Sequence, residues 1–426
     1  MKFKFSVWMC ITILLLGSAV LDKARAQEYK ESDVVVGINV PLSGPYKSQG
    51  KDQKKAYVMA IKRINARGGL LIKDIKYVIR DTETDPQVAL ENTKELINKY
   101  NADMITGGSS SAVAIAQSDV CQEYGVPFMA ALTHSRIVTG YDKTSSGPTE
   151  QKAHRHTFRW YLNDYMSKEA LIPFLEKQFG NDADYFHITA DYLWGHNLQR
   201  AIRLGTGLKG CKTVNTVLTP LGKQDFTQEL KQVQDSSADV LVLNLFGRDL
   251  VNAMEQINQM GLNESVDIVA PLMEINMASK IDNQVLQDTY STTNWYHALS
   301  EQFSGSKEFL EAFSHWYPDY KRPPGAAAAC AWVAINQWAD AVSRAGTTDP
   351  SKVIPELEGH EFTLLKGKEK WRSFDHQAIS SVLILKGKAP QNMDDKWDLL
   401  KIVDSVPGSE VMRPKTDNPV MLEPLD

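Results

Sequence analysis

Three consecutive serines, Ser109, Ser110 and Ser111, have the clearest binding chemistry in this sequence. They follow two glycines and precede a helix expected from Ala112 to Tyr124. Serine hydroxyls, the free backbone N–H groups of a first helical turn and the positive end of the helix dipole all favour an anion. Simple N-capping would account for only one of the three serines. The pattern therefore predicts an anion-binding loop and leaves open which serine contacts the ligand.

The motifs of the common hydrolases and dinucleotide enzymes are absent. The sequence has no G-x-S-x-G, no H-E-x-x-H and no CxxC pair. His154 and His156 are close together, but no cysteine or acidic residue at metal-site spacing completes a ligand set. The turn at residues 44–50 does not supply G-x-G-x-x-G. We therefore expect no catalysis, no metal and no cofactor.

The segment before the serines predicts the elements that position them. Val34–Val40 is a run typical of a buried strand, and Ile75–Ile79 is a second one. Between them, apolar residues recur at i, i+3, i+4 and i+7, which indicates a helix, and Gly68-Gly69 ends it. Strand, helix and strand in this order form a βαβ unit and predict a parallel sheet.

The same alternation continues along the chain in two series. The first series adds helices at Pro86–Tyr100 and Ala112–Tyr124 and ends with a strand at Val126–Ala131. The second series has strands at Tyr185–Thr189, Val214–Val217, Val240–Leu245 and Val266–Ala270. We predict two doubly wound α/β lobes, in which a ligand lies at the carboxyl ends of the strands.

The amino terminus has the features of a secretory signal peptide. Lys2 and Lys4 precede an apolar run from Val7 to Leu16, and Ala24-Arg25-Ala26 provides a small-residue cleavage site. The apolar run is shorter than the ~20 residues that a membrane-spanning helix needs. We expect cleavage after Ala26 and a periplasmic product.

Charge and cysteine content exclude other classes. Removal of residues 1–26 takes away four basic residues and one acidic residue, so the net charge changes from −5 to −8. This acidic balance argues against a nucleic-acid partner. Cys121, Cys211 and Cys330 remain, widely spaced and odd in number, which indicates neither a disulfide framework nor a metal site.

Several motifs near the start of the chain carry a resemblance. They are Val36-Gly37-Ile38, Pro41-Leu42-Ser43-Gly44, Ile64-Asn65-Ala66-Arg67-Gly68-Gly69, and Asp81-Thr82 followed by Asp85-Pro86. In this order and at these separations they resemble the opening of the branched-chain amino acid (Leu/Ile/Val) binding proteins of ABC transporters, which have the type I periplasmic binding protein fold. The resemblance covers about residues 33–400.

The resemblance implies a Venus-flytrap architecture, two parallel-sheet α/β lobes joined by a hinge that closes over a small ligand. The chain would cross between the lobes three times. Residues 27–158 and 297–365 would form the N-terminal lobe, and residues 159–296 and 366–426 the C-terminal lobe. We expect the segment after Val406 to be peripheral.

The resemblance also implies roles for residues outside the serine loop. Thr133 and His134 would hold a ligand carboxylate, although the family usually has a small residue or threonine where His134 stands. Glu274 would accept from a ligand ammonium, and Tyr192 and Trp194 would close over the ligand. Four further aromatic residues are candidates for lining the cleft: Trp160, Tyr161, Phe246 and Trp295.

Each of these roles has a structural alternative. His134 and Glu274 could be solvated loop residues, and Trp194 could fill the core beneath a helix. On the functional reading, the protein captures an amino acid, branched-chain or related and including aromatic ones, and delivers it as a monomer to an ABC permease. The alternatives are a periplasmic sensor of the same fold, a binding protein for an aromatic carboxylate or an amide, and a secreted hydrolase.

Overall fold

The computed structural model describes residues 33–140 and 152–425. The elements described below belong to one compact unit, Val34–Asp426. The predicted signal peptide, residues 1–26, lies outside the described residues.

A five-stranded parallel sheet forms the first half of the fold, in the order β2-β1-β3-β4-β6. Its strands are β1 (Val34–Val40), β2 (Ile75–Asp81), β3 (Met104–Gly107), β4 (Phe128–Ala130) and β6 (Thr157–Arg159). Its connections contain α2 (Lys47–Ala66), α3 (Pro86–Tyr100), α4 (Ser111–Tyr124) and the 3-10 helix η1 (Arg136–Thr139). Strand order reverses between β1 and β3, so this is the switch point where such sheets bind ligands.

A seven-stranded sheet forms the second half, in the order β16-β15-β11-β10-β9-β7-β8. Its strands are β7 (Asp184–Ala190), β8 (Lys212–Thr219), β9 (Val240–Asn244), β10 (Asp267–Leu272), β11 (Tyr290–Thr293), β15 (Val382–Gly387) and β16 (Leu400–Val406). The first five are parallel, whereas β15 and β16 are antiparallel additions. The switch point of this sheet lies between β7 and β9.

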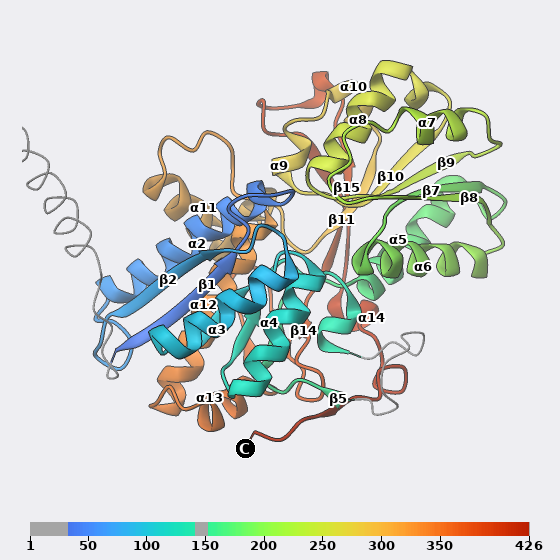
Figure 1. The fold of residues 1–426 in the computed structure, drawn as a ribbon. Helices are drawn as coiled ribbons and strands as arrows, with labels where there is room; N and C mark the ends of the chain where they lie inside the picture. Colours follow the sequence, from blue (N-terminus) through green and yellow to red (C-terminus); the bar gives the residue numbers. More distant parts are fainter. Residues whose placement is uncertain (1–32, 141–151, 426) are drawn as a thin grey trace, which may run out of the picture. The chain divides into compact units, whose positions relative to one another are not determined.

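Helices cover both faces of the second sheet. α5 (Asp164–Phe179) and α6 (Leu193–Leu208) lie on one face, and α7 (Thr227–Gln234) and α8 (Arg248–Met260) lie on the other (Figure 1). The short helices α9 (Ile275–Ala278) and α10 (Asn283–Leu286) and the 3-10 helix η2 (Leu262–Glu264) complete the connections. The expected doubly wound α/β architecture with two lobes is confirmed.

The chain then returns to the first sheet. Its elements here are η3 (His297–Glu301), α11 (Ser304–Trp316), α12 (Ala326–Ala345) and α13 (Pro350–Leu357). α12 packs along α2, and the Tyr317 hydroxyl donates to the Lys55 carbonyl of α2 at 2.8 Å. Alanines at the start of α12 permit this close approach, and Trp332, Ile335 and Trp338 are buried.

The last part of the chain differs from the expected peripheral tail. A small sheet of β12 (Glu361–Phe362), β13 (Glu369–Trp371) and β14 (Ala378–Ile379) precedes β15. After η4 (Pro390–Asn392), β16 and α14 (Gly408–Val411), the strand β17 (Met421–Leu422) pairs with β5 (Lys152–Ala153). Val411 and Asn418 are buried, so the segment after Val406 is an integral part of the fold.

The crossovers between the two sheets meet at Arg159. Its buried guanidinium donates to Gln377 Oε1 at 2.7 Å, to Thr139 Oγ1 at 2.8 Å and to the Ser135 carbonyl. Gln377 donates in turn to the Tyr161 carbonyl at 3.0 Å. Three separate chain segments are therefore joined where the polypeptide passes between the sheets. The lobe boundaries proposed from the sequence stay a prediction.

Candidate functional site

A small pocket lies where the carboxyl ends of both sheets meet. It is lined by Tyr46, Ser109, Ser111, Leu132, His134, Tyr192, Trp194, Phe246 and Leu272. All of these residues follow or end parallel strands, and both switch points contribute. The volume of the pocket is about 10 Å³, which is roughly enough for one water molecule. An organic ligand therefore requires the two walls of the pocket to separate.

The serine loop enters this pocket through a strained turn. Gly107 has φ of 142°, and a Cβ there would lie 1.9 Å from the Asn39 carbonyl oxygen, so only glycine fits. Ser109 donates to Gln53 Oε1 at 2.5 Å, and Ser111 Oγ accepts from the Ser135 N–H at 3.0 Å. Ser110 is the N-cap residue of α4, yet its side chain caps no helix N–H. N-capping therefore does not explain the loop.

His134 is held between two side chains of the second half of the fold. Its Nδ1 accepts from Trp194 Nε1 at 3.1 Å, and its Nε2 lies 2.8 Å from Ser167 Oγ. Burial lowers the pKa of His134 to about 3, so the imidazole is neutral at physiological pH. Because both ring nitrogens have protein partners, the structure does not leave His134 a free N–H for a ligand carboxylate in this conformation.

Aromatic side chains from both halves of the fold also line the pocket. The hydroxyls of Tyr46 and Tyr192 are 2.5 Å apart and link the loops that follow β1 and β7. The ring of Phe246 packs edge-on against Tyr46, with centroids 5.4 Å apart, and Trp194 packs against Phe246 at 6.0 Å. Four aromatic rings offer a large apolar surface to a ligand.

Glu274 does not line this pocket, but it lies at the boundary between the two halves of the fold. It follows β10, is 2% exposed, and neither carboxylate oxygen has a hydrogen-bond partner in the described residues. A Cβ on Gly325, the N-cap of α12, would lie 3.0 Å from Glu274 Oε2 and 3.7 Å from Asp52 Oδ2. The carboxylate therefore faces the amino terminus of α12 and a second acid.

The environment of Glu274 favours its protonated form. Burial, and then the nearby Asp52 carboxylate, raise its pKa to about 8. The Ala327 N–H and the Arg322 guanidinium act in the opposite direction, but the N–H makes no well-formed hydrogen bond with either oxygen. A cationic group from outside the chain would complete this site.

Other polar atoms that follow strands also lack hydrogen-bond partners among the described residues. They are Thr133 Oγ1, the Tyr161 hydroxyl, and both side-chain amide atoms of Asn276 and of Asn294, all in buried residues. These residues follow β4, β6, β10 and β11. Tyr161 is adjacent to His134, with ring centroids 6.2 Å apart. Buried polar atoms in folded proteins are normally paired, so this set indicates a polar ligand.

The comparison with known families decides the class of the protein. A family model described as "Periplasmic binding protein" matches residues 33–392. The chain belongs to this family. Its members are solute-binding proteins and not enzymes, and they are periplasmic, so the expectation of a non-enzyme is confirmed.

Similar proteins narrow the class further. An amino acid binding protein of Pseudomonas aeruginosa is 23% identical over 387 residues, 87% of this chain and 94% of that protein. A Leu/Ile/Val-binding protein homologue of Brucella suis biovar 1 is 23% identical over 294 residues, 68% of this chain and 72% of that protein. The predicted membership of the Leu/Ile/Val-binding type is confirmed, and this chain is a periplasmic binding protein of the amino-acid ABC transporter type.

Solved structures share the fold at low identity. A periplasmic binding protein of Burkholderia mallei has a TM-score of 0.82 at 24% identity, covering 91% of this chain and 98% of that one. A solute binding protein of Rhodopseudomonas palustris, solved with 3,4-dihydroxybenzoic acid, has a TM-score of 0.77 at 18% identity and covers 89% and 98%. A branched-chain amino acid binding protein of Streptococcus pneumoniae, solved with isoleucine, has 0.73 at 16%, covering 88% and 99%.

The fold brings together most of the candidate residues that the sequence predicted. Six of them line the pocket: Ser109, Ser111, His134, Tyr192, Trp194 and Phe246. Ser110, Thr133, Tyr161 and Glu274 do not line it but are buried in segments that follow strands. Sequence reasoning missed Tyr46, Leu132 and Leu272. The place of Tyr46, in the loop after the first strand of a doubly wound sheet, was the signal that could have identified it.

Two further candidate residues, Trp160 and Trp295, make their contacts away from the pocket. The indole of Trp160 donates to Glu369 Oε1 at 2.9 Å. The indole of Trp295 donates to Ser306 Oγ at 2.8 Å and packs on Phe309. Neither lines the pocket, and both connect the crossovers to the returning chain. Both were chosen as candidates because a large aromatic residue follows a strand. The same pattern also occurs where an aromatic side chain packs in a buried connection between elements.

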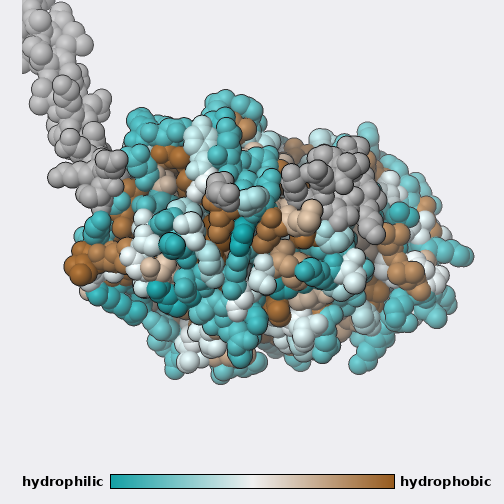
Figure 2. All heavy atoms as spheres, turned by 90° about the horizontal axis from the view of Figure 1, so that it is seen from below, coloured by the Kyte–Doolittle hydropathy of each residue, from teal (hydrophilic) through white to brown (hydrophobic). Residues whose placement is uncertain are grey.

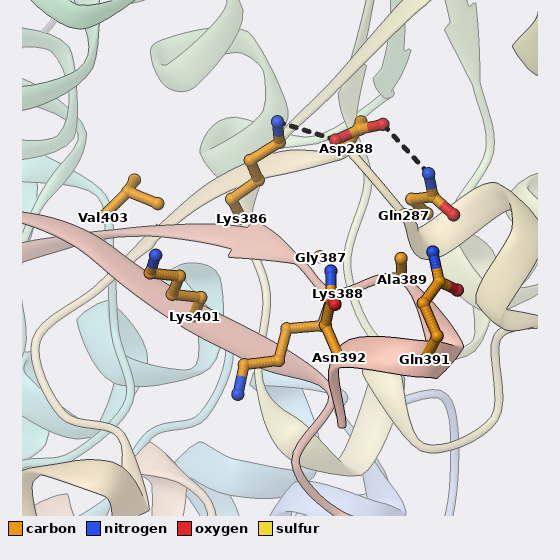
Figure 3. A pocket seen from close by; sticks show the side chains of 10 residues that line it. All are labelled: Gln287, Asp288, Lys386, Gly387, Lys388, Ala389, Gln391, Asn392, Lys401 and Val403. Carbon is orange, nitrogen blue, oxygen red and sulfur yellow. Dashed lines mark hydrogen bonds and ion pairs between the residues drawn. The ribbon is translucent and has the colours of Figure 1, made fainter. Parts of the chain in front are cut away.

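A larger pocket lies elsewhere in the described residues. Its volume is about 590 Å³, and it lies beside β15 and the edge strand β16 (Figure 3). Asp288 binds Lys386 at 2.7 Å and also accepts from Gln287, so part of the positive lining is neutralised. None of the candidate site residues lines this larger pocket. Its size alone is therefore no reason to identify it as the solute site.

Two further findings concern the described residues alone. Within residues 33–140 and 152–425, no cluster of three or more histidine, cysteine or acidic side chains could hold a metal ion. No helix in these ranges has the length and apolarity that a membrane span requires.

Proposed function

We propose that this protein captures an amino acid in the cleft between its lobes and delivers it to the permease of an ABC importer. The observation that carries the proposal is Glu274, a buried carboxyl group without a hydrogen-bond partner among the described residues. Burial of such a group is costly unless a donor or a cation pairs with it. The ammonium group of an amino acid supplies both.

The rest of the cleft is suited to the other parts of an amino acid. The serine loop at the start of α4 offers hydroxyls and backbone N–H groups for the carboxylate. The wall of Tyr46, Tyr192, Trp194 and Phe246 offers apolar surface to a branched or aromatic side chain. Solved relatives that hold isoleucine and 3,4-dihydroxybenzoic acid show that this fold accepts both kinds of solute.

A second candidate ligand is an aromatic carboxylate without an ammonium group. The four aromatic rings favour it, and the raised pKa of Glu274 would let a neutral carboxyl group remain buried beside such an anion. The two classes differ in what they require of Glu274. A ligand ammonium pairs with an ionised Glu274, whereas an aromatic acid does not.

Thermal melting of the protein, after partial unfolding to remove carried solute, tests the proposal. The panel contains leucine, isoleucine, valine, aromatic amino acids, amides and aromatic acids. A ligand at a hundredfold excess over its dissociation constant stabilises the folded state by about 2.7 kcal/mol. Glu274→Gln removes the charge and keeps the shape, so it should weaken amino acid binding by about 2 kcal/mol, roughly thirtyfold. Glu255→Gln, an exposed glutamate of α8, is the matched control.

The outcomes separate the candidates. Stabilisation by amino acids that Glu274→Gln clearly reduces and Glu255→Gln preserves supports the proposal. Stabilisation by aromatic acids alone, equal in both variants, overturns the amino acid ligand and keeps the binding-protein class. Stimulation of the ATPase activity of a reconstituted permease by the loaded protein tests delivery, and its absence would favour a sensor of the same fold.

A further inference from the structure

Two buried carboxylates from different halves of the fold lie close together at the start of α12. Asp52 belongs to α2 of the first half, and Glu274 follows β10 of the second half. They are 0% and 2% exposed. A Cβ on Gly325 would lie 3.7 Å from Asp52 Oδ2 and 3.0 Å from Glu274 Oε2, so both carboxylates lie near the same point. The boundary between the halves therefore brings two acids together.

Only one of the two acids has partners. Arg322 donates to Asp52 Oδ1 at 2.9 Å and to Oδ2 at 2.7 Å, and the Tyr320 hydroxyl also donates to Oδ1. Arg322 and Tyr320 lie in the segment between α11 and α12, so this network belongs to the first half alone. Glu274 accepts no hydrogen bond from a described residue on either oxygen. The second half thus brings its acid to the boundary without a counter-ion of its own.

The charges at this boundary do not balance. When both carboxylates are ionised, they share one guanidinium, and one negative charge remains buried. Burial and the Asp52 carboxylate raise the pKa of Glu274 to about 8, against the opposing effects of the Ala327 N–H and Arg322. Lys280 of the second half is exposed and forms no ion pair in the described residues, so solvent screens its charge. Closure of the cleft therefore needs a proton or a cation at Glu274.

We propose that Asp52 makes closure of the cleft depend on the cationic group of the solute. With the lobes apart, Glu274 is separated from Asp52 and solvated, so both acids can stay ionised. When the lobes close around an amino acid, its ammonium group supplies the positive charge that the boundary lacks. Asp52 need not touch the solute, because it acts through Glu274, and Arg322 holds it in place. The inference rests on the proposed function, which places the ammonium group at Glu274.

Closure of the solute-free protein tests the inference. Asp52→Asn keeps the shape of the side chain and removes one negative charge, so Arg322 can balance Glu274 without a solute. The closed fraction of the solute-free variant at pH 7.5 should rise about tenfold, seen as a smaller radius of gyration in X-ray solution scattering. Asp74→Asn, at an exposed acid just before β2, is the matched control and should remain as open as the wild type.

Arg322→Gln should act in the opposite direction. It leaves the two acids without a guanidinium, so the solute-free protein should stay open and closure should depend even more on a solute cation. This variant tests the inference if Asp52→Asn does not fold, which circular dichroism would show. An Arg322→Gln protein that closes more readily than the wild type would contradict the inference.

Solute preference gives a second readout, which a general structural defect would not reproduce. The probes are an amino acid of the panel that stabilises the protein and its 2-hydroxy acid, which has no ammonium group. Asp52→Asn should bind the amino acid more weakly and the hydroxy acid more tightly, so the preference between them should fall about tenfold in isothermal titration. A structural defect would weaken both.

The inference and the proposed function fail separately. If no amino acid stabilises the protein, or if Glu274→Gln leaves amino acid binding unchanged, the proposed function is wrong. Contraction of the solute-free Asp52→Asn protein would still support the opposition between the two acids. A folded Asp52→Asn protein that stays as open as the wild type without solute overturns the inference, and so does an unchanged preference for the amino acid.

Discussion

At the scale of single residues, the hydrogen bond between Tyr46 and Tyr192 is the most direct polar link across the pocket. The two hydroxyls come from loops that follow β1 and β7, so the bond joins the two sheets at their switch points. Both side chains are largely buried, and burial raises the pKa of each hydroxyl well above its ordinary value. The two uncharged hydroxyls therefore form a hydrogen bond that connects the two halves of the fold.

Removal of either hydroxyl should weaken solute binding, because closure loses one interlobe hydrogen bond. Tyr46→Phe and Tyr192→Phe should each raise the dissociation constant about fivefold, which corresponds to about 1 kcal/mol. The double variant should be no weaker than the worse single variant, since the two hydroxyls share one bond. Isothermal titration with a solute from the panel measures the three constants. Effects that simply add would show that the hydroxyls act separately.

The sequence predicted residue types at strand ends better than it predicted their contacts. His134 and Trp194 were nominated separately, and the structure joins them by a hydrogen bond that only the folded arrangement creates. Trp160 and Trp295 fitted the same pattern of an aromatic residue near a strand end, yet they bind Glu369 and Ser306. A residue's position on a strand is a local property, whereas its partner depends on how distant segments come together.

At the scale of elements, the turn between β3 and α4 determines where the serine loop lies. Gly107 approaches the carbonyl of Asn39 on β1, and Gly108 is the next residue with a positive φ, 84°. The two glycines turn the chain sharply enough to direct the start of α4 into the pocket. The loop's function therefore depends on residues that cannot themselves bind a ligand.

Gly107→Ala should destabilise the fold and weaken solute binding, because its Cβ would collide with backbone and the backbone angle is strained. We expect a loss of about 2–3 kcal/mol in the free energy of unfolding, measured by urea titration. Gly207→Ala in α6 is the matched control, since nothing lies within 4 Å of its added Cβ. There, alanine should stabilise the helix by up to about 1 kcal/mol. Equal effects at both positions would contradict this account of the turn.

Long periodic elements were predictable, and short ones were not. α3 has the bounds Pro86–Tyr100 that the apolar period and the N-terminal proline indicated. β5 and β17 have two residues each and pair over a long sequence separation, so no local pattern marks them. Their pairing, and not composition, makes the polar and proline-rich tail part of the fold.

At the scale of the whole molecule, His154 fastens this tail to the first half of the fold. Its Nδ1 lies 2.7 Å from a Glu423 oxygen, and its Nε2 lies 2.8 Å from Asp119 of α4. Burial alone would lower the pKa of His154, but hydrogen bonds and charge attraction from the two carboxylates outweigh burial and raise it. The folded state therefore favours the protonated imidazole.

Stability should consequently depend on pH through this group. Because the pKa is raised on folding, its contribution is fully present below the unfolded value of about 6.5 and is lost as pH rises through the folded value. Urea midpoints measured across this range should fall with increasing pH in the wild type and fall less in His154→Gln. His315→Gln, an exposed histidine of α11, should behave as the wild type does. Parallel curves for all three proteins would rule out the contribution.

The face in Figure 2 is mainly hydrophilic with separate hydrophobic areas. Local sequence patterns predicted both sheets, but which strand would be left at an edge depends on strand order, which the pattern does not encode. That β8 is an edge strand could therefore be recognised only from the folded arrangement.

The buried position of Glu274 has a consequence for proton exchange. Its pKa is about 8 where it faces Asp52 and α12, whereas in contact with water a glutamate titrates at about 4.3. Between these values, closure around a solute without an ammonium group takes up a proton at Glu274, while closure around an amino acid leaves the carboxylate ionised beside the cation. An aromatic acid would thus bind more tightly as the medium becomes more acidic, and an amino acid would not gain affinity through this group. The number of protons taken up on binding would therefore report the charge of the solute that this protein carries.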